Sequence, residues 1–201
     1  MIKKPENYES VQLGGDFTPI ELGGHKGVIK NVEEYKSEFS GKTSLKVYID
    51  TDKADKQPEY FAELYKNDER ENKKWSNSAI KYVSLGEEEN QVKQLKSFIT
   101  AVENSNKSFT YDWDKDIDQL KNKKVGLVFG LEEYNDSEGN IKTARKLVQF
   151  RSIDKVDEVK IPKVKLLDGS LVEYEDYTKG NNTSNKNDAV EIVLSEGELP
   201  F

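Results

Sequence analysis

One helix-like segment in this chain is preceded by strand-like segments and followed by a hairpin, and that order restricts the fold more than any other feature. Apolar residues recur at helical spacing at Val92, Leu95, Ile99 and Val102. Ser84 precedes Glu87 by three residues, which is the spacing of a capping box. We therefore expect one main helix over residues 84–104.

The segments around this helix have the composition and alternation of β-strands. Residues 25–36 form the first, and Leu45, Val47 and Ile49 alternate with polar residues in the second. The aromatic-rich residues 60–66 are interpreted as the third strand. An apolar strand over residues 125–134, a turn with Gly139 and a returning strand over residues 142–153 follow the helix. This order predicts an OB-fold, a mainly β, five-stranded Greek-key barrel with its main helix between strands three and four.

The predicted barrel accounts for only part of the chain. We expect an irregular lead-in over residues 1–22 and the OB-fold domain over residues 23–157. Residues 158–178 form either a short hairpin or an extension, and the polar residues 179–194 are typical of a linker. An acidic C-terminal tip over residues 195–201 completes the prediction.

Charge is distributed unevenly along the 201 residues. From Asp168 onward there are eight acidic residues and two lysines, whereas the first 167 residues hold 29 basic and 30 acidic residues. A nearly neutral body argues against indiscriminate duplex binding, for which a strongly basic domain is expected. It remains compatible with one basic face.

The residue types argue against an enzyme. The chain has no cysteine and only one histidine, His25, so the usual nucleophilic constellations are absent and no cofactor or metal site is expected. The N-terminal residues lack the apolar core of a signal peptide, and the longest apolar run, residues 125–131, is too short to cross a bilayer. We expect no membrane contact and a cytoplasmic location.

The OB-fold interpretation predicts where a ligand would bind. Such barrels bind oligonucleotides across strands two and three and with the adjoining loops, through stacking aromatics and a cationic track. Lys46 and Tyr48 are expected to face outward, and Arg145 and Arg151 to share one face of strand five. The alternative for each residue is ordinary packing or solvated surface. The predicted nucleic-acid-binding residues are Phe39, Lys42, Lys46, Tyr48, Tyr65, Lys74, Trp75, Tyr134, Arg145, Lys146 and Arg151.

Several runs resemble a protein family encoded by phages and prophages of Gram-positive bacteria within replication and recombination modules. The runs are Lys73-Lys74-Trp75 and residues 97–114, 120–146 and 150–156, and the resemblance spans roughly residues 22–165. It implies an OB-type, single-stranded-DNA-binding role in the host bacterial cytoplasm. It supplies no catalytic motif.

The C-terminal tip carries a second resemblance. Glu196, Glu198, Leu199, Pro200 and Phe201 resemble the acidic tip of bacterial single-stranded-DNA-binding proteins, with Gly197 interrupting a shorter acidic run. An aromatic ring beside a carboxylate suits a partner with an apolar pocket and a cationic side chain. The tip is therefore expected to recruit replication or recombination proteins.

The sequence thus predicts a protein that binds single-stranded DNA without strong sequence preference. A protein-binding adaptor without nucleic-acid affinity is the main alternative, and a carboxylate-based, metal-dependent nuclease is the third. The oligomeric state, including a homo-oligomer, is left open.

Overall fold

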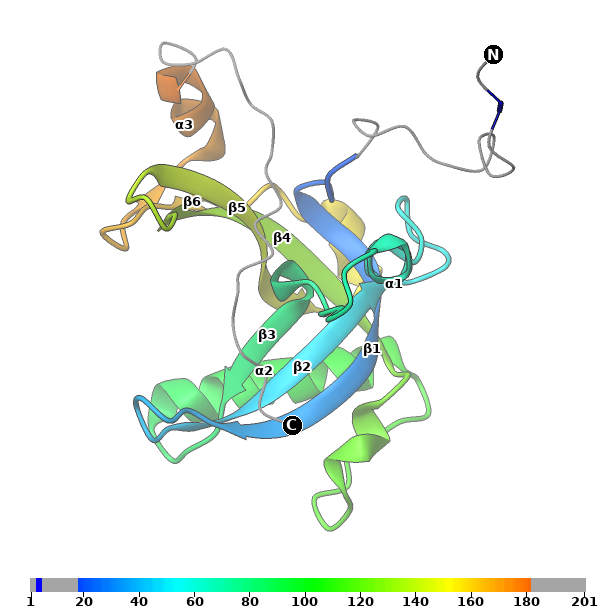
Figure 1. Cartoon of the computed structure of the whole chain (residues 1–201). Helices are drawn as coiled ribbons and strands as arrows, with labels where there is room; N and C mark the ends of the chain where they lie inside the picture. The colour runs from blue at the N-terminus through cyan, green and yellow to red at the C-terminus, as the bar shows by residue number, and fades with distance from the viewer. Residues whose placement is uncertain (1–2, 5–17, 182–201) are drawn as a thin grey trace.

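The computed structural model describes residues 3–4 and 18–181, and its framework is one sheet of seven strands (Figure 1). The ladders run in the order β3-β2-β1-β4-β6-β7, and β5 also pairs with β4. The four long strands are β1 (Gly23–Lys36), β2 (Thr43–Thr51), β4 (Lys124–Asn135) and β5 (Ile141–Arg151). The three short strands are β3 (Ile80–Ser84), β6 (Val164–Lys165) and β7 (Leu171–Val172).

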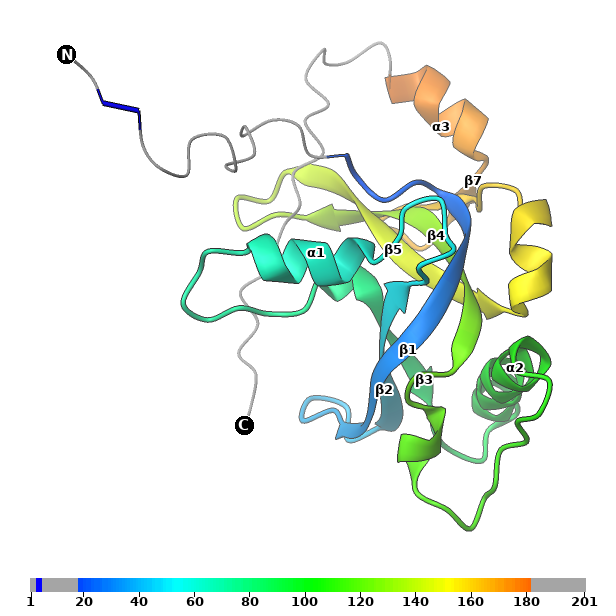
Figure 2. The ribbon, with the colours of Figure 1, turned by 90° about the vertical axis from the view of Figure 1, so that its right-hand side faces the viewer.

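In the described part of the chain, three α-helices and three short 3₁₀ helices accompany the sheet. The α-helices are α1 (Tyr60–Asn67), α2 (Glu89–Ser105) and α3 (Tyr174–Asn181). The 3₁₀ helices are η1 (Asn77–Ala79), η2 (Ile117–Leu120) and η3 (Ile153–Glu158). Helix α2 lies behind β1, β2 and β3 in Figure 1, and Figure 2 shows α1 and α2 on opposite sides of these strands.

Strand β1 is the centre of the sheet because both of its edges are paired. Residues 27–36 pair antiparallel with β2, and residues 23–28 pair antiparallel with β4. Residues 27 and 28 pair on both sides, and the β1–β2 ladder shifts register just beyond them, between Ile29 and Asn31. The strands predicted over residues 25–36, around residues 45–49 and over residues 125–134 and 142–153 are all present.

The core lies between the sheet and α2. Val47 and Ile49 of β2 and Phe129 of β4 are fully buried, and α2 contributes Phe98 and Val102. Removing apolar surface from water is worth about 25 cal/mol per Å², so this shared core fixes which face of each strand points inward.

The third strand was predicted in the wrong place. The aromatic segment at residues 60–66 forms α1, whose Tyr60, Phe61 and Leu64 pack against the core at helical rather than alternating spacing. Asp50 of β2 supports this helix, because its Oδ1 accepts the backbone N–H of Phe61 at 2.9 Å. The third strand is β3, where Val83 is the only buried residue.

The main helix lies between β3 and β4, as predicted, but it begins later. Ser84 ends β3 and does not cap a helix. Instead Glu88 and Gln91 form the capping box, and α2 starts at Glu89. The spacing of a capping box identified the right region but the wrong pair of residues.

The predicted barrel is not closed. Within residues 18–181 no ladder joins β3 to β5, and we call the gap between these two strands the seam. The Lys81 side chain of β3 spans it, with Nζ donating to the backbone oxygen of Leu147 of β5 at 3.4 Å. Strand β3 has only five residues and offers few backbone groups for a ladder.

The last described segment adds a small extension to β4. Strand β6 pairs parallel with β4 at Glu132, and β6 and β7 pair antiparallel before α3. Lys179 and the next two residues of the expected linker belong to α3. The rest of that linker and the acidic tip, residues 195–201, lie outside the described residues. No described helix combines the length and apolar character that crossing a membrane requires.

Candidate nucleic-acid interface

The outward face of β1, β2 and β3 gathers aromatic side chains. In the ladders Lys46 lies opposite both Glu33 of β1 and Tyr82 of β3, and Tyr35 and Tyr48 lie on the same side of the sheet. We call Glu33, Tyr35, Lys46, Tyr48 and Tyr82 the tyrosine face. It is opposite the core because Leu45, Val47 and Ile49 alternate with these residues and point inward.

The rings on the tyrosine face pack closely. The centroids of Tyr35 and Tyr82 are 5.3 Å apart, and the side chain of Tyr82 is exposed. Tyr48 is less accessible, and burial followed by the charge of Glu33 raises its pKa. Burial likewise raises the pKa of Tyr82. The Tyr48 and Tyr82 rings therefore carry a neutral hydroxyl at physiological pH and offer an uncharged surface for stacking.

Lys46 faces outward from the core, the side expected for it, but neighbouring side chains leave it only 8% exposed. Its Nζ lies 5.0 Å from the ring centroid of Tyr48 and 6.0 Å from that of Tyr35. Such cation–π contacts are worth about 0.5–2 kcal/mol depending on desolvation. The positive charge is thus held beside the tyrosine rings.

Glu33 is an exposed carboxylate held in place by two neutral donors. Its Oε1 accepts from Asn31 Nδ2 at 2.8 Å and its Oε2 accepts from the Tyr48 hydroxyl at 3.1 Å. No ion pair joins Glu33 to Lys46 in the described part of the chain, although the two residues are partners in the ladder.

Predicted residues flank both ends of the tyrosine face. At the turn between β1 and β2, Phe39 is fully exposed and Lys42 is also exposed. At the end of the tyrosine face near Tyr48, the indole N–H of Trp75 donates to the backbone oxygen of Ile49 at 3.1 Å. Ile49 is the residue after Tyr48. Tyr65 belongs to α1 and not to a strand, and its ring centroid lies 5.7 Å from that of Trp75. Lys74, the residue before Trp75, is half-buried. Trp75 is therefore anchored to the core of the protein.

The predicted pair of arginines on β5 is not on one face. A register shift opposite Val128 and Phe129 brings Leu147 and Phe150 to the core, three residues apart. This bulge reverses the alternation, so Arg145 and Arg151 lie on opposite faces. Arg145 is turned inward and donates to the backbone oxygen of Ile20, whereas Arg151 is exposed at the far end of β5.

A cluster of lysines surrounds Glu132 near the seam. Lys165 Nζ lies 3.9 Å from a Glu132 carboxylate oxygen. Burial lowers the pKa of Lys81 and of Lys146, and the charge of Glu132 partly opposes both shifts. Lys165 therefore forms an ion pair with Glu132, and Lys81 and Lys146 lie within electrostatic range of the same carboxylate. Tyr134 lies further along β4, opposite Lys142 and close to the hairpin turn.

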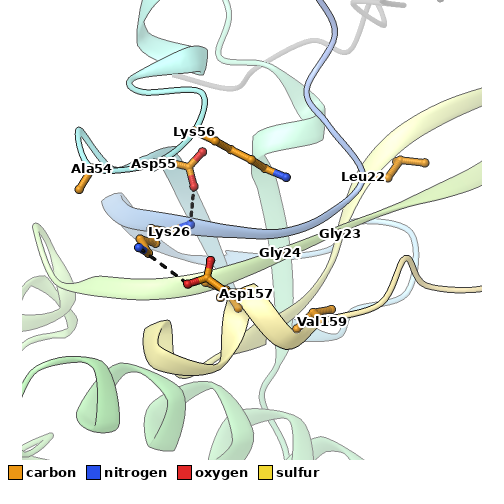
Figure 3. A pocket seen from close by; sticks show the side chains of 10 residues that line it. Leu22, Gly23, Gly24, Lys26, Ala54, Asp55, Lys56, Asp157 and Val159 are labelled. Carbon is orange, nitrogen blue, oxygen red and sulfur yellow. Dashed lines mark hydrogen bonds and ion pairs between the residues drawn. The ribbon is translucent and has the colours of Figure 1, made fainter.

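A separate hollow of about 410 Å³ lies between β1, the loop after β2 and η3 (Figure 3). Asp55 at its wall accepts from His25 Nδ1 at 2.8 Å and from the backbone N–H of Lys26 at 2.6 Å. Burial alone would raise the pKa of Asp55, but these hydrogen bonds and one from Gln57 lower it overall. His25 and Asp55 thus hold the loop against β1. No group of three or more histidine, cysteine or acidic side chains suited to a metal occurs within the described residues.

Sequence reasoning missed three members of the tyrosine face: Glu33, Tyr35 and Tyr82. Tyr82 was missed because β3 was not predicted, although Lys81 and Val83 alternate with it. Tyr35 and Glu33 lie after the register shift in β1, so simple alternation from the buried Ile29 assigns their faces incorrectly.

Comparison of the chain with protein-family models gives no match, and comparison with curated proteins gives no significant match. The resemblance to the phage family therefore remains a prediction.

Proposed function

We propose that this protein binds single-stranded DNA, without strong sequence preference, along the tyrosine face. The observation that carries the proposal is the placement of three tyrosines and Lys46 on adjacent strands, with Phe39 exposed at one end. Stacking on aromatic rings is worth about 1–3 kcal/mol per base and tolerates any base, since every base has a π-face.

The strand order supports an OB-type architecture. The ladders β3-β2-β1-β4-β5, with a helix between β3 and β4, have the order expected of an OB-fold whose barrel is left open. In that fold ligands cross strands two and three between the β1–β2 and β4–β5 loops. The tyrosine face lies on β2 and β3 with the adjoining part of β1, the first of these places.

The phosphate backbone needs positive charge along its path. Lys42, exposed in the turn between β1 and β2, and Lys46, held beside the tyrosine rings, supply it, although the first 167 residues together are nearly neutral. We infer a short cationic track and a correspondingly modest dependence of affinity on salt. The acidic segment at residues 195–201 is proposed to recruit replication or recombination proteins of the host or the phage.

Binding of fluorescent oligo-dT, followed by anisotropy and compared with a duplex of equal length, tests the proposal. We expect the single strand to bind more tightly. Tyr82→Ala should weaken binding about tenfold, because one stacking surface is lost. Tyr82→Phe should restore most of the affinity.

Trp113→Ala provides the matched control. Trp113 is 69% exposed, and its segment between α2 and β4 lies beyond β1 at the lower right of Figure 1. Its removal should leave affinity unchanged. If neither DNA binds while lysate proteins are captured, the adaptor alternative gains support; cleavage of the strand with Mg²⁺ present would support the nuclease.

A further inference from the structure

Glu33 is an acidic residue in the middle of a surface that we propose binds a polyanion. A negative charge at this position opposes such binding, unless the carboxylate has a separate role. A bare carboxylate repels phosphate, so a purely non-specific stacking surface has no use for it. The structure nevertheless fixes this carboxylate, with Asn31 and Tyr48 each donating to one of its two oxygens.

The two hydrogen bonds leave acceptor capacity unused. An ionised carboxylate offers about four lone-pair sites, of which Asn31 and Tyr48 occupy two. Each oxygen therefore keeps one acceptor position, and Glu33 is exposed to solvent. Since its ladder partner Lys46 is directed at the tyrosine rings instead, no ion pair with another described residue takes the remaining positions.

A pair of adjacent acceptors selects among bases by their donors. Guanine presents two neighbouring donors, N1–H and the N2 amino group, which match both oxygens of one carboxylate. Cytosine and adenine each present one exocyclic amino group. Thymine presents a single N–H between two carbonyl oxygens, which the carboxylate repels.

We infer that Glu33 is a specificity-determining residue that gives the tyrosine face a preference for guanine over thymine. The base stacks on the tyrosine rings, and its donor edge turns toward Glu33. This inference rests on the proposed function. It adds a modest base preference to a surface whose stacking is otherwise indifferent to sequence.

The test compares three strands of about 16 nucleotides, near the upper site size of a single OB-fold. One is oligo-dT, the second carries isolated guanines separated by thymines, and the third carries inosine in place of each guanine. Inosine keeps N1–H and lacks only the N2 amino group. We expect the guanine strand to bind at least about fivefold more tightly than oligo-dT, and inosine to lose most of that gain.

Two variants assign the effect to Glu33. Glu33→Gln removes the charge while keeping the shape, and should abolish the guanine preference and tighten binding of oligo-dT slightly. Glu34→Gln removes the same charge from the next residue, which is exposed but lies opposite Leu45 on the other side of the strand. It should keep the preference.

Equal affinity of the unaltered protein for all three oligonucleotides would overturn the inference about Glu33. It would not contradict the proposal that the protein binds single-stranded DNA. A guanine preference that survives in Glu33→Gln would also overturn it. Failure of every strand to bind would instead reject the proposed function itself.

Discussion

At the scale of single residues, Trp75 shows how packing and ligand binding compete for the same side chain. Its position after two lysines resembles an exposed stacking residue. In the structure its indole N–H is committed to the backbone oxygen of Ile49, and its ring packs against the core. The ring thus braces the strand that presents Tyr48.

Replacing Trp75 with Phe separates these two roles. The aromatic ring is kept but the hydrogen bond is lost, so we expect the free energy of unfolding to fall by about 1 kcal/mol. Urea denaturation followed by circular dichroism measures it. Affinity for oligo-dT should change less than twofold. A large loss of affinity at unchanged stability would instead place Trp75 in the interface.

Asp55 gives a prediction for pH. Its pKa is lowered in the folded protein, so its contribution to stability is present above its ordinary value of 3.8 and is lost as the pH falls through the lowered value. Asp55→Asn should reduce stability at pH 7 and should flatten the acid side of the stability curve. Urea midpoints for both proteins across acidic pH test this; parallel curves would contradict it.

At the scale of elements, the long strands could be predicted because half-buried strands alternate visibly. Residues 60–66 could not be assigned from composition, since aromatic enrichment favours a strand whereas the core contacts of Phe61 and Leu64 require a helix. Strand β3 has one buried residue and too little contrast to detect. The same holds for the candidate site. Alternation in β2 was enough to predict that Lys46 and Tyr48 face outward. The place of Tyr82, and the bulge that puts Arg145 and Arg151 on opposite faces, depend on pairing between distant segments and could not be predicted.

The packing of η3 on the sheet yields an element-scale prediction. A Cβ added to Gly24 would lie 1.9 Å from the backbone oxygen of Val156, so β1 and η3 touch backbone to backbone. Gly24→Ala should therefore destabilise the protein by about 1–3 kcal/mol or more, because η3 must move. Thermal unfolding measures the effect. Lys30→Ala, at an exposed position of the same strand, should be nearly neutral, and equal melting temperatures for the two variants would contradict this packing.

At the scale of the whole molecule, the excess negative charge and the basic residues of the proposed interface lie in different parts of the chain. Residues from Asp168 onward hold eight acidic residues against two lysines, whereas the lysines at the proposed interface lie earlier. If the protein binds DNA as proposed, an acidic segment tethered to the same molecule is expected to compete with the DNA at millimolar effective concentration.

Deletion of residues 195–201 should consequently leave the unfolding midpoint unchanged and raise affinity for oligo-dT modestly at low salt. Raising the salt should erase the difference, since screening weakens the competing acidic segment. Deleting Phe201 alone should abolish capture of partners from bacterial lysate while DNA affinity stays the same. Loss of DNA binding after either deletion would contradict the prediction that the acidic segment competes with DNA.

The double pairing of β1 also governs how quickly the chain can find its native state. Its pairs with β2 join near neighbours, so that hairpin can form early at low entropic cost. Its pairs with β4 join Gly23 to Phe129 and require a very long loop to close first. Refolding is therefore expected to be limited by docking of the β4–β5 hairpin onto a preformed β1–β2 hairpin, and mutations in the β1–β4 ladder should slow folding more than equally destabilising changes in η3.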